Sequence, residues 1–343
     1  MEKIRIGING IGRIGKLLFR LTHHRKDMET MVVNDPMNLN ALIHSLRYDT
    51  VHGAFGQTVV ADEEQQSILV NGKKTRKYGY HDPFDIPWHK HGVQVVIDAS
   101  GLFVTRESLQ KHGKEGVRNI VLSCPPAEKL DNMIVIGVNE DSLRPGQKVI
   151  SNASCTTNCI APVLQLIEGH WGIDRAFMNT VHPFTSSQNV TDGPHRDLRR
   201  ARCASQNIIP TTTSAIKGVH TLMPGFVGRF DGMATRVPVS DGSFVELNAI
   251  LRGKATVAEV NDLFREAAGG LMEGIIQYCE DPIVSSDVIG NPHSAVFDSL
   301  STRMLGGNFL HIIVWYDNEF AYANRLVELI ALLKKQWTSH DQV

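Results

Sequence analysis

The sequence predicts an α/β protein with a doubly wound parallel sheet in its N-terminal half, followed by an α+β domain with a mixed, largely antiparallel sheet. Three observations support this prediction. Short runs rich in β-branched residues alternate with helix-compatible stretches up to about residue 150. Longer β-like runs dominate beyond residue 170. The length of 343 residues is typical of two domains of roughly 150 residues each.

The N-terminal elements follow one another in a regular order. Ile4, Ile6 and Ile8 alternate with other residues as in a buried strand, and a glycine loop and helically spaced apolar residues follow. Further strands are expected at residues 31–33, 93–97, 120–122 and 134–138, with a helix within 105–115. Strands that alternate with helices form a parallel sheet covered on both faces.

The pattern changes near residue 151. A helix is expected over about 156–169, and β-like runs then occupy residues 177–181, 232–238, 244–251 and 309–316. A long irregular loop, residues 185–205, carries several arginines, and loops of this length are usually functional or disordered. A helix over about 323–337 ends the pattern. We expect a first domain at 1–153, a catalytic domain at 154–318, and a segment, 319–343, whose helix packs back on the first domain.

Composition excludes several classes of partner. The charges nearly cancel, with 35 Lys+Arg against 36 Asp+Glu, which disfavours nucleic-acid binding. No apolar run approaches the roughly 18 residues of a membrane-spanning helix, and no signal-peptide pattern is found. The five cysteines are too few and too scattered for a disulfide framework. We therefore expect a cytoplasmic protein without a membrane partner.

The glycine loop predicts a dinucleotide site. Residues 10–15 read GIGRIG, a G-x-G-x-x-G sequence that directly follows a strand and opens a helix. Gly10 allows the tight turn, Gly12 leaves room for a pyrophosphate, and Gly15 lets the helix and the strand pack closely. The helix N-terminus offers unpaired N–H groups to the phosphates. The first domain is therefore expected to be a Rossmann domain.

Asp35 supplies the second half of this fingerprint. It lies 20 positions after Gly15, at the end of the next strand. Its carboxylate is suited to accept hydrogen bonds from the adenosine ribose and to repel a 2′-phosphate, which favours NAD over NADP. The alternative is that Asp35 only starts a turn before the following proline.

A cysteine at a helix start is the candidate nucleophile. Cys155 lies between Ser154 and Thr156 where the helix expected over about 156–169 begins, and a helix N-terminus stabilises a thiolate. Cys159, one turn further on, is interpreted as a buried structural residue. A closed zinc site needs four ligands, and the sequence offers no second cysteine pair or matching histidine spacing, so no metal is expected.

His182 is the candidate base, and a group of arginines and threonines suggests anion sites. His182 ends an apolar strand and opens the arginine-bearing loop, where side chains converge on a cleft. The alternative is a histidine packed at a strand end. Arg200 and Arg236, with Thr156, Thr185 and Thr213, are suited to bind phosphate oxygens. A solvated basic face is the alternative, and spacing alone leaves both open.

Several blocks along nearly the whole chain are distinctive as sequences. They are residues 8–15 (INGIGRIG), 34–36 (NDP), 48–53 (YDTVHG), 151–159 (SNASCTTNC), 192–202 (DGPHRDLRRAR), 207–210 (NIIP), 236–238 (RVP) and 315–319 (WYDNE). On these blocks the sequence resembles the phosphorylating glyceraldehyde-3-phosphate dehydrogenase family. The block at 151–159 is highly specific to that family.

The resemblance implies a role for each matching residue. Cys155 matches the catalytic thiol, His182 its partner base, and Asn318 the side chain that holds the nicotinamide carboxamide. The remaining matches are Asp35 at the ribose, Arg13 and Ile14 at the pyrophosphate, Ser100 and Ser123 in the cofactor cleft, Thr185 and Arg236 at the substrate phosphate, and Ser154, Thr156, Arg200 and Thr213, with the neighbouring Ser214, at inorganic phosphate. The family also implies a homotetramer in which the arginine loop lies against a neighbouring subunit's cofactor.

The implied reaction oxidises glyceraldehyde 3-phosphate with NAD and inorganic phosphate to 1,3-bisphosphoglycerate, through a thiohemiacetal and a thioester on Cys155. This is a reaction of glycolysis or gluconeogenesis. The related erythrose-4-phosphate dehydrogenase is the first alternative, although Thr185 is kept and no lysine follows Thr213. A non-catalytic NAD-binding interaction protein is the second. The sequence departs from the family pattern at Ser187, Ser214, residues 240–242 (SDG) and Ala321, where the family usually has Asp, Gly, a Pro-Asn-containing run and Gly.

Overall fold

The computed structural model describes residues 3–338, which form two compact units. Within this range the first unit contains residues up to 134, residues 139–153 and residues from 323 on, and the second contains residues 135–138 and 154–322. Among residues 3–338 there is no helix with the length and apolar character needed to cross a membrane.

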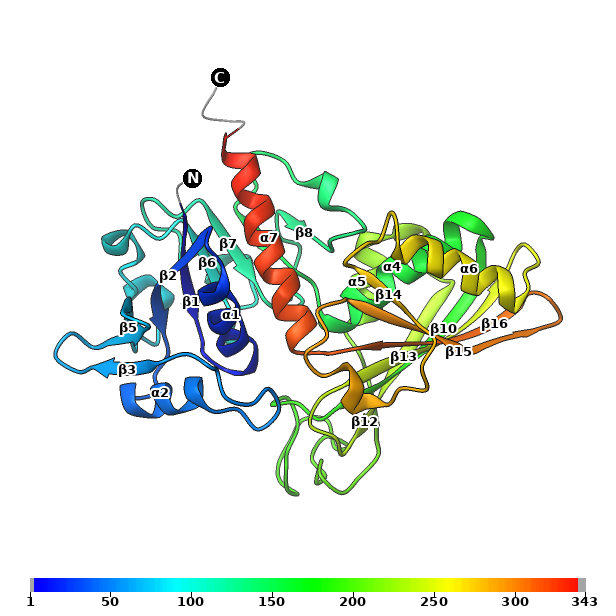
Figure 1. The fold of residues 1–343 in the computed structure, drawn as a ribbon, viewed down its shortest axis with the longest axis horizontal. Coiled ribbons are helices and arrows are strands. Elements are labelled where there is room, and N and C mark those ends of the chain that lie inside the picture. Colours follow the sequence, from blue (N-terminus) through cyan, green and yellow to red (C-terminus); the bar gives the residue numbers. More distant parts are fainter. Residues whose placement is uncertain (1–2, 339–343) are drawn as a thin grey trace. The chain divides into compact units, whose positions relative to one another are not determined.

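The first unit contains a sheet in the order β3-β4-β5-β2-β1-β6-β7-β9-β8 (Figure 1). Its central strands run parallel. The strands are β1 (Ile4–Asn9), β2 (Met28–Asn34), β3 (Val59–Asp62), β4 (Ser67–Val70), β5 (Lys73–Tyr78), β6 (Val95–Asp98), β7 (Asn119–Leu122), β8 (Asn132–Met133) and β9 (Val149–Ser151). The helices are α1 (Arg13–His24), α2 (Leu39–Arg47) and α3 (Arg106–Gln110). The parallel sheet predicted for this half is confirmed.

Two details of the first unit differ from the prediction. Residues 134–138 are not a strand: β8 ends at Met133, and Gly137, with a φ of +86°, turns the chain. The helix expected within 105–115 is found as the short helix Arg106–Gln110. The antiparallel ladder β3-β4-β5 at the sheet edge was not expected.

The second unit contains the sheet β11-β12-β10-β13-β16-β15-β14. Only the pairs β10·β12 and β14·β15 are parallel, so the predicted mixed, largely antiparallel sheet is confirmed. The strands are β10 (Ile173–Pro183), β11 (Ile209–Thr211), β12 (Phe230–Val237), β13 (Ser243–Leu251), β14 (Ile276–Cys279), β15 (Ala295–Leu305) and β16 (Phe309–Tyr316). The helices are α4 (Cys155–His170), α5 (Ala215–Leu222) and α6 (Val257–Ala268).

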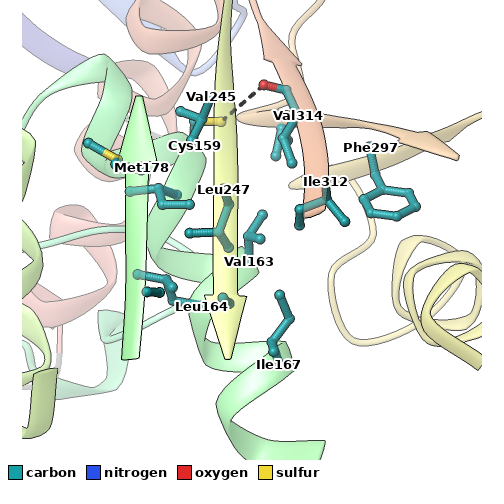
Figure 2. Close-up of a cluster of buried hydrophobic side chains, with 14 of the residues drawn as sticks. Cys159, Val163, Leu164, Ile167, Met178, Val245, Leu247, Phe297, Ile312 and Val314 are labelled. Atoms are coloured by element: carbon teal, nitrogen blue, oxygen red, sulfur yellow. Dashed lines mark hydrogen bonds between the residues drawn. The ribbon is translucent and has the colours of Figure 1, made fainter. Parts of the chain in front are cut away.

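Helix α4 is anchored in the core of the second unit. Its residues Cys159, Val163 and Leu164 are fully buried against side chains of β10, β13 and β16, as Figure 2 shows. Cys159 Sγ lies 4.0 Å from the carbonyl oxygen of Val314, which fits a structural cysteine. The first residue of this helix, Cys155, is thus the end of a rigidly packed element.

Helix α7 (Phe320–Thr338) ends the described chain (Figure 1). From Ala323 on it belongs to the first unit, and its apolar stripe of Leu326, Leu329, Ile330 and Leu333 is buried. Trp337 Nε1 donates to Asn119 Oδ1 of the same unit at 2.7 Å.

Candidate functional site

The glycine turn after β1 has the shape that a dinucleotide requires. Gly10 has a φ of +88°, and a Cβ on it would lie 2.6 Å from the Cα of Ser100. A Cβ on Gly15 would lie 1.9 Å from the carbonyl oxygen of Gly10. At Gly12, by contrast, an added Cβ meets no described atom within 4 Å. Two glycines are therefore needed to close the turn, and the third keeps its outer side open at the N-terminus of α1.

The other predicted cofactor residues follow neighbouring strands of the same sheet. Asp35 comes after β2, and its carboxylate accepts hydrogen bonds from the backbone N–H groups of Ile11 (2.8 Å) and Met37 (2.9 Å). Ser100 comes after β6 and Ser123 after β7. Because β1, β2, β6 and β7 run parallel, their carboxyl ends lie at one edge of the sheet, where such sheets bind ligands. These residues fit a dinucleotide.

Arg13 and Ile14 begin α1, and the Arg13 side chain is held by a residue that the sequence analysis did not single out. Both of its terminal nitrogens donate to Asp49, and Lys16 Nζ lies 2.7 Å from the same carboxylate. Burial alone would raise the pKa of Asp49, but these two cations and the backbone N–H groups of the next turn hold it far below its usual range. Asp49 lies within the YDTVHG block, and this block was the feature of the sequence that could have pointed to it.

Cys155 and His182 meet at the end of the second unit's sheet. Ser154 caps α4, since its Oγ accepts the backbone N–H of Thr157 at 3.0 Å, and Cys155 is the first helical residue. The Cys155 sulfur lies 3.6 Å from His182 Nε2. His182 is near the end of β10, and the parallel register pairs it with Arg236 of β12. The structure therefore brings the predicted thiol, base and arginine together.

His182 is neutral and has two partners on its far side. Burial, followed by the positive charge of Arg236, lowers the pKa of His182 to about 3. An Arg236 Nη1 lies 2.7 Å from His182 Nδ1 and 2.8 Å from the carbonyl oxygen of Pro183, which is itself 2.9 Å from Nδ1. With Nδ1 accepting from Arg236, Nε2 carries the proton; with Nδ1 donating to Pro183, Nε2 is free to accept one. The ring can therefore both donate and accept a proton on the sulfur side.

Opposing effects act on the thiol of Cys155. Burial raises its pKa above the ordinary value, while the Thr156 hydroxyl and the Arg236 charge act to lower it. The resident thiolate predicted from the helix N-terminus is thus opposed by burial, and His182 is the nearby group to receive the thiol proton.

Tyr316 is a further residue of the site that sequence reasoning missed. Its buried hydroxyl lies 2.9 Å from Thr156 Oγ1 and 3.0 Å from Thr180 Oγ1, and its ring lies edge-on to His182 at 6.1 Å. The Thr156 side chain therefore faces Tyr316, and its role at a phosphate stays a prediction. The WYDNE block contains this tyrosine, but nothing in the sequence shows that it reaches α4.

The remaining phosphate candidates lie on the arginine loop and at α5. Thr185 Oγ1 is 2.8 Å from Ser187 Oγ. Arg200 Nε donates to Thr211 Oγ1 at 2.9 Å. Burial lowers the pKa of Arg236, and the nearby charge of Arg200 also acts to lower it. Thr213 and Ser214 directly precede α5; the Ser214 side chain does not cap the helix, and Thr213 Oγ1 accepts the Ala215 N–H at 3.3 Å. Two cations and a helix N-terminus form an electropositive group suited to anions.

Asn318 follows β16 and lies in a buried polar turn. Its Oδ1 accepts a hydrogen bond from Ser243 Oγ at 2.7 Å. Asp241 and Asp317, both buried, lie beside it. Burial and then the charges of Asp317 and Glu319 raise the pKa of Asp241 to about 9, so Asp241 is protonated at neutral pH.

Asp241→Asn should stabilise the protein, and more so at pH 8 than at pH 4. The folded pKa of Asp241 is above the unfolded value near 4, so the folded state holds the extra proton and stability falls as pH rises toward 9. The free energy of unfolding can fall by at most about 1.4 kcal/mol per pH unit from this one group. Urea unfolding at both pH values measures the difference; an equal effect at the two would contradict the protonated state.

Comparison with known proteins matches both units. The family profile described as "Glyceraldehyde 3-phosphate dehydrogenase, NAD binding domain" matches residues 4–106, and "Glyceraldehyde 3-phosphate dehydrogenase, C-terminal domain" matches residues 154–318. Glyceraldehyde-3-phosphate dehydrogenase 1 of Bacillus subtilis is 42% identical over 334 residues, which cover 97% of this chain and 99% of the relative. The enzyme of Priestia megaterium is 43% identical, covering 95% and 97%, and that of Geobacillus stearothermophilus is 42% identical, covering 96% and 98%. The chain therefore belongs to the glyceraldehyde-3-phosphate dehydrogenase family, whose members are NAD-dependent oxidoreductases.

Proposed function

We propose that the protein oxidises glyceraldehyde 3-phosphate with NAD and inorganic phosphate to 1,3-bisphosphoglycerate. One observation carries this proposal: the Cys155 sulfur, at the start of α4, lies 3.6 Å from Nε2 of a neutral His182. This is the spacing at which a histidine activates a thiol toward a carbonyl carbon. The family of the chain supplies the substrate class.

The residues of the second unit carry the covalent steps. The Cys155 thiol proton passes to His182 Nε2 as sulfur bonds to the aldehyde carbon, and the same proton then moves to the aldehyde oxygen, which gives a thiohemiacetal. When NAD is bound, it supplies the acceptor for the hydride of that carbon. His182 removes the hydroxyl proton as the hydride leaves, and a thioester remains on Cys155. Phosphate oxygen attacks the thioester carbon, the sulfur leaves as thiolate and is reprotonated from His182, and the product is an acyl phosphate.

The electropositive side chains are proposed to hold the two phosphates. Arg236 and Thr185 bind the phosphate of the aldehyde, while Arg200, Thr213 and Ser214 bind inorganic phosphate together with Ser154 and Thr156. The proximity of Arg200 to Arg236 supports anion binding here, because two cations that repel each other are stabilised by bound anions.

The first unit and Asn318 are proposed to hold NAD. The turn formed by Gly10, Gly12 and Gly15, with the backbone of Arg13 and Ile14, binds the pyrophosphate, and Asp35 binds the adenosine ribose. Ser100 and Ser123 line the cleft at the ends of β6 and β7, and Asn318 holds the nicotinamide carboxamide.

We further propose a homotetramer located in the cytoplasm and acting in glycolysis or gluconeogenesis. The arginine loop supports association, since it has no helix or strand and exposes the apolar side chains of Val190 and Leu198. A neighbouring subunit would cover such side chains.

The activity assay follows NADH absorbance with glyceraldehyde 3-phosphate, in the presence and absence of inorganic phosphate, beside erythrose 4-phosphate. We expect rapid NADH formation that depends on phosphate and prefers the three-carbon aldehyde. A preference for the four-carbon aldehyde without phosphate dependence would support the related dehydrogenase instead. The family comparisons do not favour that alternative.

Asp35→Ala and Asp35→Asn should both relax the discrimination against NADP. Either change removes the negative charge that repels a 2′-phosphate. Lys77 lies close enough to interact with Asp35, and without that carboxylate its positive charge can instead attract the 2′-phosphate. Asp35→Asn is the milder variant because it keeps an oxygen that can accept from Ile11 N–H. The ratio of NADP to NAD affinity, measured by calorimetry, checks this; an unchanged ratio in both variants means that other residues set it.

A further inference from the structure

The side chain of Asn318 has one well-defined polar neighbour. Ser243, the first residue of β13, is fully buried, and its Oγ lies 2.7 Å from Asn318 Oδ1. Asn318 itself is 6% exposed. In the described part of the chain, residues 3–338, this is the hydrogen bond found for the Asn318 amide group.

The Ser243 hydroxyl dictates which way the amide of Asn318 faces. A hydroxyl carries one hydrogen, and a buried hydroxyl must donate it or lose a hydrogen bond. Asn318 Oδ1 is the acceptor within reach. The opposite orientation would place the amide NH2 against the hydroxyl oxygen and leave the hydroxyl hydrogen without an acceptor. The amide oxygen is thereby assigned to Ser243, and Nδ2 is left to donate elsewhere.

The backbone holds Ser243 firmly in this place. The antiparallel register pairs Ser243 with Tyr316, two residues before Asn318. The preceding Gly242 has a φ of +83°, and a Cβ on it would lie 2.0 Å from the carbonyl oxygen of Ser285. The chain therefore enters β13 through a turn that only glycine permits. Sheet pairing fixes Ser243 directly, and Asn318 follows two residues after the residue with which Ser243 is paired.

We propose that Ser243 is a positioning residue that selects the amide orientation of Asn318, so that Asn318 presents its NH2 to the carboxamide oxygen of the nicotinamide. The proposal rests on the proposed role of Asn318 in NAD binding. Ser243 makes no contact with the cofactor in this scheme and acts only through Asn318.

The test measures binding rather than turnover, with three ligands and the Ser243→Ala variant. NAD carries the carboxamide, its 3-acetylpyridine analogue keeps the carbonyl but lacks the NH2 group, and ADP-ribose lacks the pyridine ring. Calorimetry should show NAD binding weakened roughly three- to tenfold, the usual effect of one lost hydrogen bond, and ADP-ribose binding unchanged. The analogue should lose at least about twofold more than NAD, because it accepts from only one amide orientation while a carboxamide can rotate to meet either.

Two further variants separate positioning from a general structural effect. Ser299→Ala removes a similarly buried hydroxyl of the same unit, which donates to the Cys279 carbonyl oxygen at 2.7 Å, and should leave all three affinities unchanged. In an Asn318→Ala background, adding Ser243→Ala should cause no further loss. Equal weakening of ADP-ribose, or equal weakening of NAD and the analogue, would overturn the proposal. Wild-type protein that fails to bind NAD or to oxidise the aldehyde would instead overturn the proposed function.

Discussion

Cys155→Ser should bind NAD normally but turn over on the order of 10³-fold more slowly, or worse. The serine hydroxyl fits the same position at the start of α4, so the cofactor residues of the first unit are undisturbed. A hydroxyl is much harder to ionise than a thiol, so the same histidine activates serine far less than it activates cysteine. A thioester, the intermediate that phosphate attacks, also requires sulfur. Stopped-flow absorbance for the hydride step and calorimetry for NAD measure the two properties separately.

Cys159→Ala is the matched control for this experiment. Cys159 lies one turn further along the same helix, and its buried sulfur faces the Val314 carbonyl oxygen of β16 (Figure 2). We expect it to lose on the order of 1 kcal/mol of folding stability and to keep its turnover. If Cys155→Ser kept near-normal activity, or if Cys159→Ala lost it while remaining folded, Cys155 would not be the nucleophile.

Gly15→Ala should destabilise the first unit by roughly 3 kcal/mol or more, because its methyl group would lie 1.9 Å from the backbone oxygen of Gly10. Neither atom is at the end of a flexible side chain, so the turn between β1 and α1 would have to open. Thermal unfolding in the absence of cofactor measures this change.

Gly12→Ala should leave folding stability nearly unchanged but weaken NAD binding. A Cβ there meets no described atom, and the backbone φ of −74° suits alanine, so unfolding should be little changed. The methyl group would stand where the pyrophosphate approaches, and we expect NAD affinity to fall at least tenfold, or about 1.4 kcal/mol. Normal NAD binding by Gly12→Ala would remove the glycine turn from the cofactor site.

The parts of the fold that could be predicted are those determined by residues close together in the sequence. The strand, turn and helix of residues 4–24 follow from alternation, glycine and helical spacing within one short stretch. The position of Cys155 at a helix start follows from the polar residues that precede a helical stretch, and the structure adds that Ser154 caps this helix. The strand predicted at 134–138 was wrong because its apolar residues suit a strand, while the left-handed turn at Gly137 determines the local structure.

The rest of the site depends on pairings between distant segments. Arg236 reaches His182 through the register of β10 and β12, 54 residues apart, and Tyr316 reaches Thr156 across 160 residues. Spacing along one sequence carries no information on such registers. The resemblance to a family named Arg236 as a phosphate ligand, but only the structure places it against the base.

The pairing of β10 with β12 also determines what the long loop is free to do. His182 and Arg236 occupy the same rung of adjacent parallel strands, so their separation is set by the interstrand spacing of about 4.8 Å and by the side-chain alternation of the pleat. Neither quantity depends on the length of the long loop at residues 185–205. The loop could thus lengthen, shorten or change its sequence while the two side chains keep their mutual distance, which leaves this segment open to altered substrate preference or subunit contacts without cost to the proton-transfer geometry.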